Sequence, residues 1–384
     1  MKKNNMPAKR LNSVKEYYFS SKLREVGSLI KSGKAIINLG IGSPDLLPSN
    51  DVISSLVESV SDSNAHQYQS YQGIPEFRQA ISVFYKSHYK VELNPKDEVL
   101  PLIGSKEGIM HISMAFLNPG DQVLIPNPGY PTYSSVTKLL EAEPILYNLK
   151  EFDGWLPSLN LLEKMDLSKV KIMWINYPHM PTGSEVNDSF FDDLISFAKR
   201  NNILVVNDNP YSFILTKHPK SFLSHNGAID VGMELNSLSK SFNMAGWRVG
   251  MLLGNQSNIK SVLKVKSNMD SGMFYGVQKG AIKALSLDKK WFYDLNKIYE
   301  ERREVAWKIA DKLKTTYNKN AVGLFIWARL PDSIENPDVL IDELLYKKNI
   351  FITPGKIFGS QGERYIRISL CSSTLKLKEA LNRL

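Results

Sequence analysis

Cysteine, long apolar runs and grouped histidines are scarce in this sequence, and each shortage excludes a class of protein. Cys371 is the only cysteine among 384 residues, so no disulfide framework can form within the chain and a reducing compartment is expected. No stretch approaches the ~18 consecutive apolar residues of a membrane span, and the basic segment 1–10 leads into no apolar stretch of an export signal. The six histidines stand apart, without the spacing of metal ligands. We therefore expect a cytoplasmic protein without a membrane segment or a metal site.

Length and composition are those of an ordinary globular protein. Hydrophobic residues make up 43% and charged residues 23%, and 384 residues suffice for two domains with a sizeable core. The net charge of +9 comes from Lys and Arg scattered among acids, without one long basic block. Nucleic acid is therefore not an expected partner, whereas an anionic cofactor and anionic small-molecule substrates would suit the charge.

The most informative stretch runs from residue 236 to residue 250, N-S-L-S-K-S-F-N-M-A-G-W-R-V-G. Lys240 can form an imine with an aldehyde if burial and nearby cations lower its pKa. Ser237 and Ser239 offer hydroxyl donors, and Arg248 offers a planar fork that suits a phosphate dianion. An aldehyde together with a phosphate describes pyridoxal phosphate. A lone S-x-x-K would instead favour a serine-rich surface loop whose charges are solvated, because short motifs often match by chance.

The same stretch resembles the signature S-x-S-K-x-x-x-x-x-G-x-R-x-G of the fold type I aminotransferases of class I and II, which use pyridoxal phosphate. The resemblance implies an α/β fold with a large cofactor-binding domain, residues 49–276, around a mostly parallel seven-stranded sheet. A smaller α+β domain would be built from both chain ends, residues 1–48 and 277–384. Within it, apolar spacing predicts a long amphipathic helix over 288–313, with the run E-E-R-R-E at 300–304 on its solvated side.

Turns and strand ends elsewhere match the cofactor contacts of this family. The turn G-S-K-E-G opens a helix and is a natural anion site, and the resemblance assigns Ser105 and Lys106 to the cofactor phosphate. Tyr130, in P-N-P-G-Y-P-T-Y, matches the aromatic that stacks on the pyridine ring. Asp208 follows a buried strand and would be a costly buried acid unless the protonated ring nitrogen pairs with it. Tyr211 matches the tyrosine that hydrogen-bonds the cofactor's phenolic oxygen.

Substrate and subunit contacts also follow from the resemblance. Gly42, in G-I-G-S-P-D, matches the glycine that lies against the substrate carboxylate, where a residue without Cβ leaves room. Arg367 lies in a β-alternating segment, needs an anion if it points inward, and matches the arginine that grips the substrate α-carboxylate. Tyr68 matches the tyrosine that reaches the cofactor phosphate of the neighbouring subunit, which implies a homodimer with shared active sites.

The implied reaction is transamination between an L-amino acid and a 2-oxo acid. The substrate amine displaces Lys240 from its imine, and the freed ε-amine moves a proton between the substrate Cα and the cofactor, while Asp208 and the ring store charge. A lyase, such as a carbon–sulfur lyase, would use the same residues. A sensor that holds the cofactor without turnover is a third hypothesis, although it would usually carry a DNA-binding module, and none is seen.

Substrate choice stays open in the sequence, and one position departs from the family pattern. Four aromatic residues can either line a pocket for apolar or aromatic substrate side chains or pack in the core: Tyr17, Tyr18, Phe19 and Tyr71. Where the family usually reads N-P-x-N-P-T-G, this chain reads N-Y-P-H-M-P-T-G, so Met180 replaces an asparagine that donates to the phenolic oxygen. A thioether cannot donate a hydrogen bond, so we expect a raised pKa of the cofactor imine unless His179 or a water supplies the donor.

Overall fold

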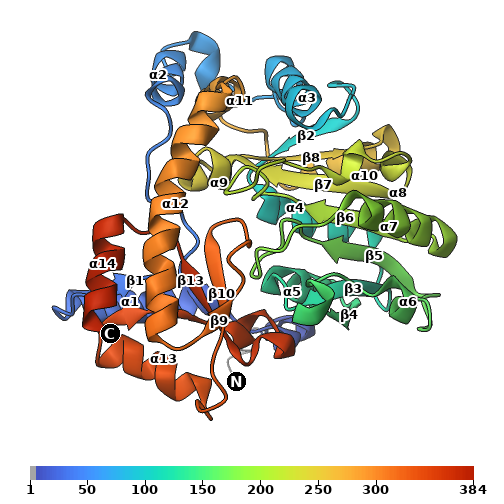
Figure 1. The fold of residues 1–384 in the computed structure, drawn as a ribbon. Helices are drawn as coiled ribbons and strands as arrows, with labels where there is room; N and C mark the ends of the chain where they lie inside the picture. Colours follow the sequence, from blue (N-terminus) through green and yellow to red (C-terminus); the bar gives the residue numbers. More distant parts are fainter. Residues whose placement is uncertain (1–5) are drawn as a thin grey trace, which may run out of the picture.

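A computed structural model describes residues 6–384, and residues 1–5 of the basic N-terminal segment lie outside the description. A seven-stranded sheet forms the centre of one part of the molecule, in the order β2-β8-β7-β6-β5-β3-β4 (Figure 1). β8 runs antiparallel to both neighbours and the other pairs are parallel, which confirms the predicted sheet. The strands are β2 Val99–Leu102, β3 Gln122–Asn127, β4 Glu143–Asn148, β5 Val170–Ile175, β6 Leu204–Asp208, β7 Gly232–Ser237 and β8 Gly250–Gly254.

Helices cover both faces of this sheet because its strands send alternate apolar side chains into two cores. Ile172 and Trp174 of β5 pack with the helices α4, α5 and α10 on one face. Met173 and Ile175 of the same strand face the other core, which α3, α7 and α11 complete. Strands buried on both faces therefore read as continuous apolar runs. The helices of this part are α2 Asn50–Ser59, α3 Pro75–Tyr89, α4 Ser105–Phe116, α5 Pro131–Leu139, α6 Leu159–Leu162, α7 Asp188–Asn201, α8 Ala228–Val231, α9 Leu238–Ser241, α10 Gln256–Lys266 and α11 Tyr275–Leu285.

Short-range sequence signals fix the ends of several helices. Pro75 occupies the first turn of α3, where its missing N–H costs nothing, and Lys90 ends the helix with a left-handed φ of 61°. The Asn187 side chain accepts a hydrogen bond from the Phe190 N–H at 2.9 Å and so caps α7. Local sequence signals therefore account for these helix ends.

The second part of the molecule is built from both ends of the chain. An antiparallel sheet in the order β12-β13-β10-β9 forms its centre, and β1 from the N-terminal segment pairs in parallel with β11. The long helix α12 lies along these strands and reaches up beside the large sheet (Figure 1). The elements are α1 Tyr18–Lys31, β1 Ile37–Asn38, α12 Lys289–Lys312, β9 Thr316–Tyr317, β10 Phe325–Arg329, α13 Pro337–Tyr346, β11 Ile350–Phe351, β12 Thr353–Pro354, β13 Tyr365–Ser369 and α14 Thr374–Arg383.

The charged run at 300–304 of α12 does not all face solvent, so this prediction was wrong for Arg302. The Arg302 side chain is 3% exposed and donates to both carboxylate oxygens of Asp45, at 2.6 and 3.0 Å. It also donates to the backbone oxygen of Leu370 at 3.1 Å. A bidentate carboxylate satisfies the buried guanidinium, and the helical repeat alone does not reveal so distant a partner.

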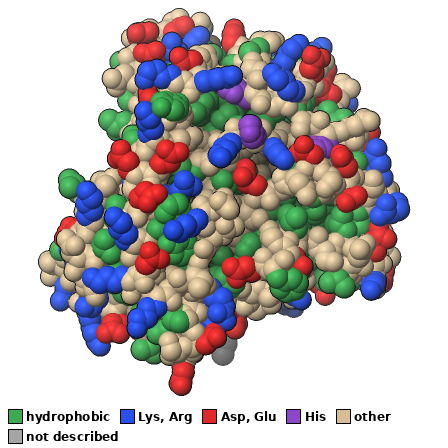
Figure 2. All heavy atoms as spheres, viewed as in Figure 1, with side chains coloured by type: hydrophobic (Ala, Val, Ile, Leu, Met, Phe, Trp, Pro, Cys, Tyr) green, Lys and Arg blue, Asp and Glu red, His purple; other side chains and the backbone are tan. Residues whose placement is uncertain are grey.

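Basic and acidic side chains are interspersed over the face of the molecule shown in Figure 2, without a continuous basic patch there. Within residues 6–384, no helix is both long enough and apolar enough to cross a membrane. Cys371 is a buried free thiol.

Candidate active site

A cavity of about 340 Å³ lies where the parallel strands β5, β6 and β7 end, which is where open α/β sheets bind ligands. The start of α1 and the strands β10 and β13 contribute the opposite wall. Every site residue predicted from the sequence, except Tyr68, lines this cavity. The wall consists of Tyr17, Phe19, Leu23, Ile41, Gly42, Ser43, Ser105, Lys106, Tyr130, Tyr133, Asn176, Met180, Asp208, Pro210, Tyr211, Ser237, Ser239, Lys240, Arg248, Phe325, Phe358 and Arg367.

One end of the cavity gathers cations and hydroxyls without a carboxylate. Ser105 is the first residue of α4, so the unpaired backbone N–H groups of a helix N-terminus lie at this end. Partial burial and the neighbouring Arg248 lower the pKa of Lys106. The Ser237 hydroxyl donates to the Ser239 hydroxyl at 2.8 Å. This combination of groups suits a phosphate dianion.

Gly104 makes this close grouping possible, and sequence reasoning did not assign it a role. Its φ of +88° favours glycine, and a Cβ at this position would run into the guanidinium of Arg248. A Cβ at Gly250 would lie 2.7 Å from the backbone nitrogen of Ser105. The two glycines therefore let the arginine and the helix N-terminus approach the same point.

Asp208 has an unused acceptor at the end of β6. The Tyr133 hydroxyl donates to its Oδ2 at 2.9 Å, whereas the buried Oδ1 has no hydrogen-bond partner among the described residues. Burial raises the pKa of Asp208 to about 6, and the Tyr133 hydrogen bond and the Lys240 charge oppose that rise. A buried unpaired acceptor is costly, so this carboxylate fits a ligand that carries a proton or a positive charge.

Lys240 lies on α9, the single helical turn that follows β7, and its Nζ donates to the backbone oxygen of Gly42. Burial lowers the pKa of this lysine, and the charges of Arg367 and Arg248 act in the same direction. A lowered pKa increases the fraction of neutral, nucleophilic amine. The rings of Tyr130 and Tyr211 line the same cavity.

Arg367 is buried without a carboxylate partner. Its Nη2 donates to the backbone oxygen of Gly40 at 2.7 Å, its Nη1 lies 3.3 Å from the sulfur of Met180, and its Nε has no partner. Burial lowers the pKa of Arg367 to about 10. Such a guanidinium fits an incoming anion. Beside it, a Cβ added to Gly42 would collide with the ring of Phe325, so this glycine also makes room for a protein side chain.

Met180, which stands where the family usually has an asparagine, lies in the cavity wall, and its sulfur faces Arg367. His179 does not line the cavity: its Nδ1 lies 2.8 Å from the Thr182 hydroxyl, and burial lowers its pKa to about 3. Asn176 does line it, but its amide donates to the Asp208 backbone oxygen and its oxygen accepts from the Met180 N–H. His179 therefore lies outside the cavity wall, and the Asn176 side chain is already hydrogen-bonded to two backbone groups.

Tyr68 lies apart from the cavity of its own chain. It is 89% exposed and borders a surface groove formed by residues 68–72 and by α10, including Lys260 and Lys264. Tyr71 belongs to this groove, and Tyr18, the first residue of α1, packs against the core cluster of Val26, Leu345 and Phe351 rather than in the cavity wall. Of the four aromatic residues considered for the substrate pocket, only Tyr17 and Phe19 line it.

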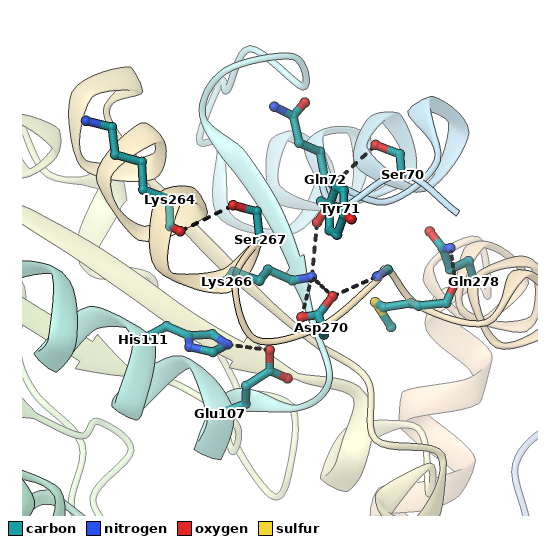
Figure 3. Close-up of polar contacts among 12 residues, drawn as sticks. Ser70, Tyr71, Gln72, Glu107, His111, Lys264, Lys266, Ser267, Asp270 and Gln278 are labelled. Atoms are coloured by element: carbon teal, nitrogen blue, oxygen red, sulfur yellow. Dashed lines mark hydrogen bonds and ion pairs between the residues drawn. The ribbon is translucent and has the colours of Figure 1, made fainter. Parts of the chain in front are cut away.

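A buried polar cluster ties the segment 68–72 to the turn after α10 (Figure 3). Lys266 is 1% exposed, and its Nζ donates to Asp270 at 2.9 Å and to the backbone oxygen of Tyr71 at 3.0 Å. His111 Nε2 lies 2.7 Å from Glu107 Oε1 on the first turns of α4. Glu107, His111 and Asp270 bring possible metal ligands within 4.8 Å of one another. The Lys266 ammonium pairs with Asp270 and so already supplies the positive charge that a metal ion would bring.

Several wall residues were not predicted from the sequence. Tyr133 lies in the first turn of α5, three residues after Tyr130, which precedes that helix; this short interval was the available signal that both could reach the same site. Phe325 and Phe358 come from distant segments, and no local pattern links them to the other wall residues.

Residues 34–384 match the model of the family Aminotransferase class I and II. The chain is 37% identical over 379 residues to LL-diaminopimelate aminotransferase of Halothermothrix orenii, with 98% of this chain and 97% of that protein covered. It is equally 37% identical over 377 residues to the protein of the same name from Aquifex aeolicus, with 98% and 97% covered.

Solved structures have the same fold. Substrate-bound BacF from Bacillus subtilis superposes with a TM-score of 0.95 at 35% identity, with 99% of this chain and 97% of that chain covered. An aminotransferase from Staphylococcus aureus superposes with a TM-score of 0.89 at 30% identity, with 98% of each chain covered. The chain therefore belongs to the class I and II aminotransferases, pyridoxal-phosphate enzymes that move an amino group between an amino acid and a 2-oxo acid.

Proposed function

We propose that this aminotransferase binds pyridoxal 5′-phosphate in the cavity and holds the aldehyde carbon of the cofactor on Lys240. The observation that carries the proposal is the buried Oδ1 of Asp208, which lacks a partner in a cavity that also holds Lys240. A protonated pyridine nitrogen supplies that partner. The aldehyde and the ring nitrogen lie at opposite sides of the pyridine ring, so one molecule can engage both residues.

Other wall residues fit the remaining groups of the cofactor. Ser105 and Lys106, with Ser237 and Ser239, would donate to the phosphate, and Arg248 would pair with its charge. The ring of Tyr130 would stack on the pyridine and exclude water from one face.

When bound, pyridoxal phosphate supplies an electron sink for charge that develops on the substrate Cα. Asp208 keeps the sink effective, because its carboxylate favours the protonated ring nitrogen. Lys240, whose pKa burial lowers, is available as a neutral amine to take a proton from the substrate Cα and return it. Arg367 would bind the α-carboxylate beside Gly42, and the Tyr211 hydroxyl would donate to the phenolic oxygen.

The assembly and the compartment are part of the same proposal. Exposed Tyr68 would reach the cofactor phosphate of a second copy, giving a homodimer with shared active sites.

The division into domains at 49–276 and at 1–48 with 277–384 is supported by the large sheet, whose strands all lie between Val99 and Gly254. The lone cysteine, which is buried as a free thiol, favours the cytoplasm. The relatives' name makes LL-diaminopimelate one amino donor to test, with a 2-oxo acid as the acceptor.

Borohydride reduction of the protein incubated with the cofactor tests the assignment. The expected result is a pyridoxyl group fixed to the peptide that contains Lys240, detected by mass spectrometry, and no label in Lys240→Arg. Label on another lysine would contradict the proposal. Conversion of the cofactor to its amine form by one amino acid then distinguishes transamination from a lyase reaction, which regenerates the aldehyde and releases ammonia.

A further inference from the structure

The segment 40–45, G-I-G-S-P-D, contacts two cations of the cavity although it forms neither a helix nor a strand. The backbone oxygen of Gly40 accepts a hydrogen bond from Nη2 of Arg367 at 2.7 Å, and the backbone oxygen of Gly42 accepts one from Nζ of Lys240. In the proposed reaction, Arg367 binds the α-carboxylate and Lys240 moves the Cα proton of one substrate. The position of this segment therefore helps to fix the two groups relative to each other.

Hydroxyl groups of the second part of the molecule hold the start of this segment. Thr353 of β12 donates to the backbone oxygen of Gly40 at 2.7 Å, and Ser369 of β13 donates to the backbone oxygen of Ile41 at 2.6 Å. These two strands pair with each other, and β13 also carries Arg367. The start of the segment is therefore attached to the sheet that positions this arginine.

Asp45 holds the other end of the segment through Arg302 of α12. Both carboxylate oxygens accept from the guanidinium, at 2.6 and 3.0 Å, in a bidentate arrangement that fixes orientation as well as distance. Arg302 also donates to the backbone oxygen of Leu370 at 3.1 Å, and Leu370 directly follows β13. One buried guanidinium thus ties the end of the segment to the end of the strand that carries Arg367.

The ion pair lies outside the active-site cavity. Asp45 borders a second cavity of about 270 Å³, whose wall shares Ile41 and Ser43 with the wall of the active-site cavity. Segment 40–45 therefore separates two open spaces. A chain without regular structure that has open space on both sides is easily displaced unless side chains anchor it, and the Arg302 guanidinium supplies such an anchor.

We propose, building on the proposed function, that Asp45 and Arg302 are positioning residues for transamination. Their ion pair holds segment 40–45 in place, so that Arg367 binds the α-carboxylate while Lys240 reaches the Cα proton of the same substrate. The pair acts through the segment and does not touch the reacting atoms. Without the pair, the segment can move toward the second cavity and take its backbone oxygens away from both cations. A displacement of about 1 Å in a catalytic site can cost about a hundredfold in rate.

Arg302→Met breaks the pair and places an apolar side chain at the buried position. The variant should fold, because the Asp45 side chain is 34% exposed and water can hydrate it once its partner is gone. The cofactor-loaded wild type and variant are each mixed rapidly with one amino acid at a time, taken from the common L-amino acids and LL-diaminopimelate. Absorption then reports the conversion of the cofactor to its amine form.

The second-order rate constant should fall by about tenfold or more in Arg302→Met for every amino acid that reacts. The order of the amino acids should stay the same, because all of them share the α-carboxylate and the Cα proton. Cofactor retention, measured by titration with the cofactor, should match that of the wild type, because other segments supply the phosphate end of the cavity. Arg302→Lys keeps a donor for Asp45 and should recover part of the rate.

Arg303→Met is the matched control at the next position of α12. The Arg303 guanidinium carbon lies 5.0 Å from the ring centroid of Trp307, so the same substitution removes a packed arginine and leaves the ion pair intact. Its rates should equal those of the wild type. Asp45→Asn combined with Arg302→Met should be no slower than Arg302→Met alone, because both residues act through one pair.

Three results would overturn the inference and leave the proposed function intact. They are unchanged rates in Arg302→Met, equal falls in Arg302→Met and Arg303→Met, and a fall in Arg302→Met that matches a loss of cofactor. If no amino acid converts the cofactor of the wild type, the proposed function and the inference both fail.

Discussion

The stability of the cofactor-free protein should depend on pH through Asp208. Burial raises the pKa of this carboxyl to about 6 in the folded chain, whereas an unfolded aspartate has a pKa of about 3.9. The folded form therefore binds more protons between these two values. The stability that protonation contributes is fully present below pH ~4 and is lost as the pH rises through ~6. Two pKa units correspond to roughly 3 kcal/mol in the free energy of unfolding.

Asp208→Asn removes the titrating group and keeps the shape of the side chain. Between pH 4.5 and 7.5, the free energy of unfolding of the wild type should fall by about 2 kcal/mol relative to that of the variant. Urea unfolding of the cofactor-free proteins at one protein concentration measures this difference. Trp174 gives a local fluorescence signal, because it is buried and stacks on Tyr133 with 4.9 Å between ring centroids.

Tyr133→Phe is the matched control for this titration. The Tyr133 hydroxyl donates to the Asp208 carboxylate and lowers its pKa, so its loss should move the fall in stability to higher pH. Parallel pH profiles for the wild type and Asp208→Asn would refute the reasoning, because they would show that the carboxyl titrates alike in the folded and unfolded states.

Three further predictions concern the rest of the site and the buried Lys266–Asp270 pair. Met180→Asn adds a donor to the cofactor's phenolic oxygen and should lower the pKa of the cofactor imine by about one unit, measured by pH titration of its absorption band. Superimposable titrations of the wild type and the variant would mean that another group already donates. Tyr68→Phe should weaken cofactor retention, measured by titration with the cofactor, whereas a fully active monomer in sedimentation-coupled assays would contradict the shared site. Lys266→Met leaves Asp270 without its buried partner and should lower the free energy of unfolding by about 3 kcal/mol in urea; Asp270→Asn in the same chain should restore part of the loss.

Much of the candidate site is predictable from the sequence because the signals that mark its residues are short-range. Ser105 and Lys240 follow apolar strands and Asp208 ends one, and the ends of neighbouring strands meet at one edge of a sheet. Turn residues and the interval between Lys240 and Arg248 do not depend on distant contacts. Element boundaries are less well determined by the sequence: β1 extends only over Ile37–Asn38, because its length depends on pairing with β11.

Only the tertiary structure decided which distant side chains meet. Arg302 looked solvated in the helical pattern, yet Asp45, 257 positions earlier, holds it in the core. The Phe325 ring occupies the space that a Cβ at Gly42 would need. Arg367 lies against Met180, which comes from a distant segment of the chain.

The sequence by itself determined the family, the sheet and the residues that line the candidate site, since apolar runs, breakers and motif intervals are local properties of the chain. The tertiary structure decided that Tyr17 and Phe19 enter the cavity while Tyr18 and Tyr71 do not. The physical reason is that an aromatic side chain has the same apolar character in a core and in a pocket. Its surroundings depend on packing between segments far apart in the chain, and no local pattern records that packing.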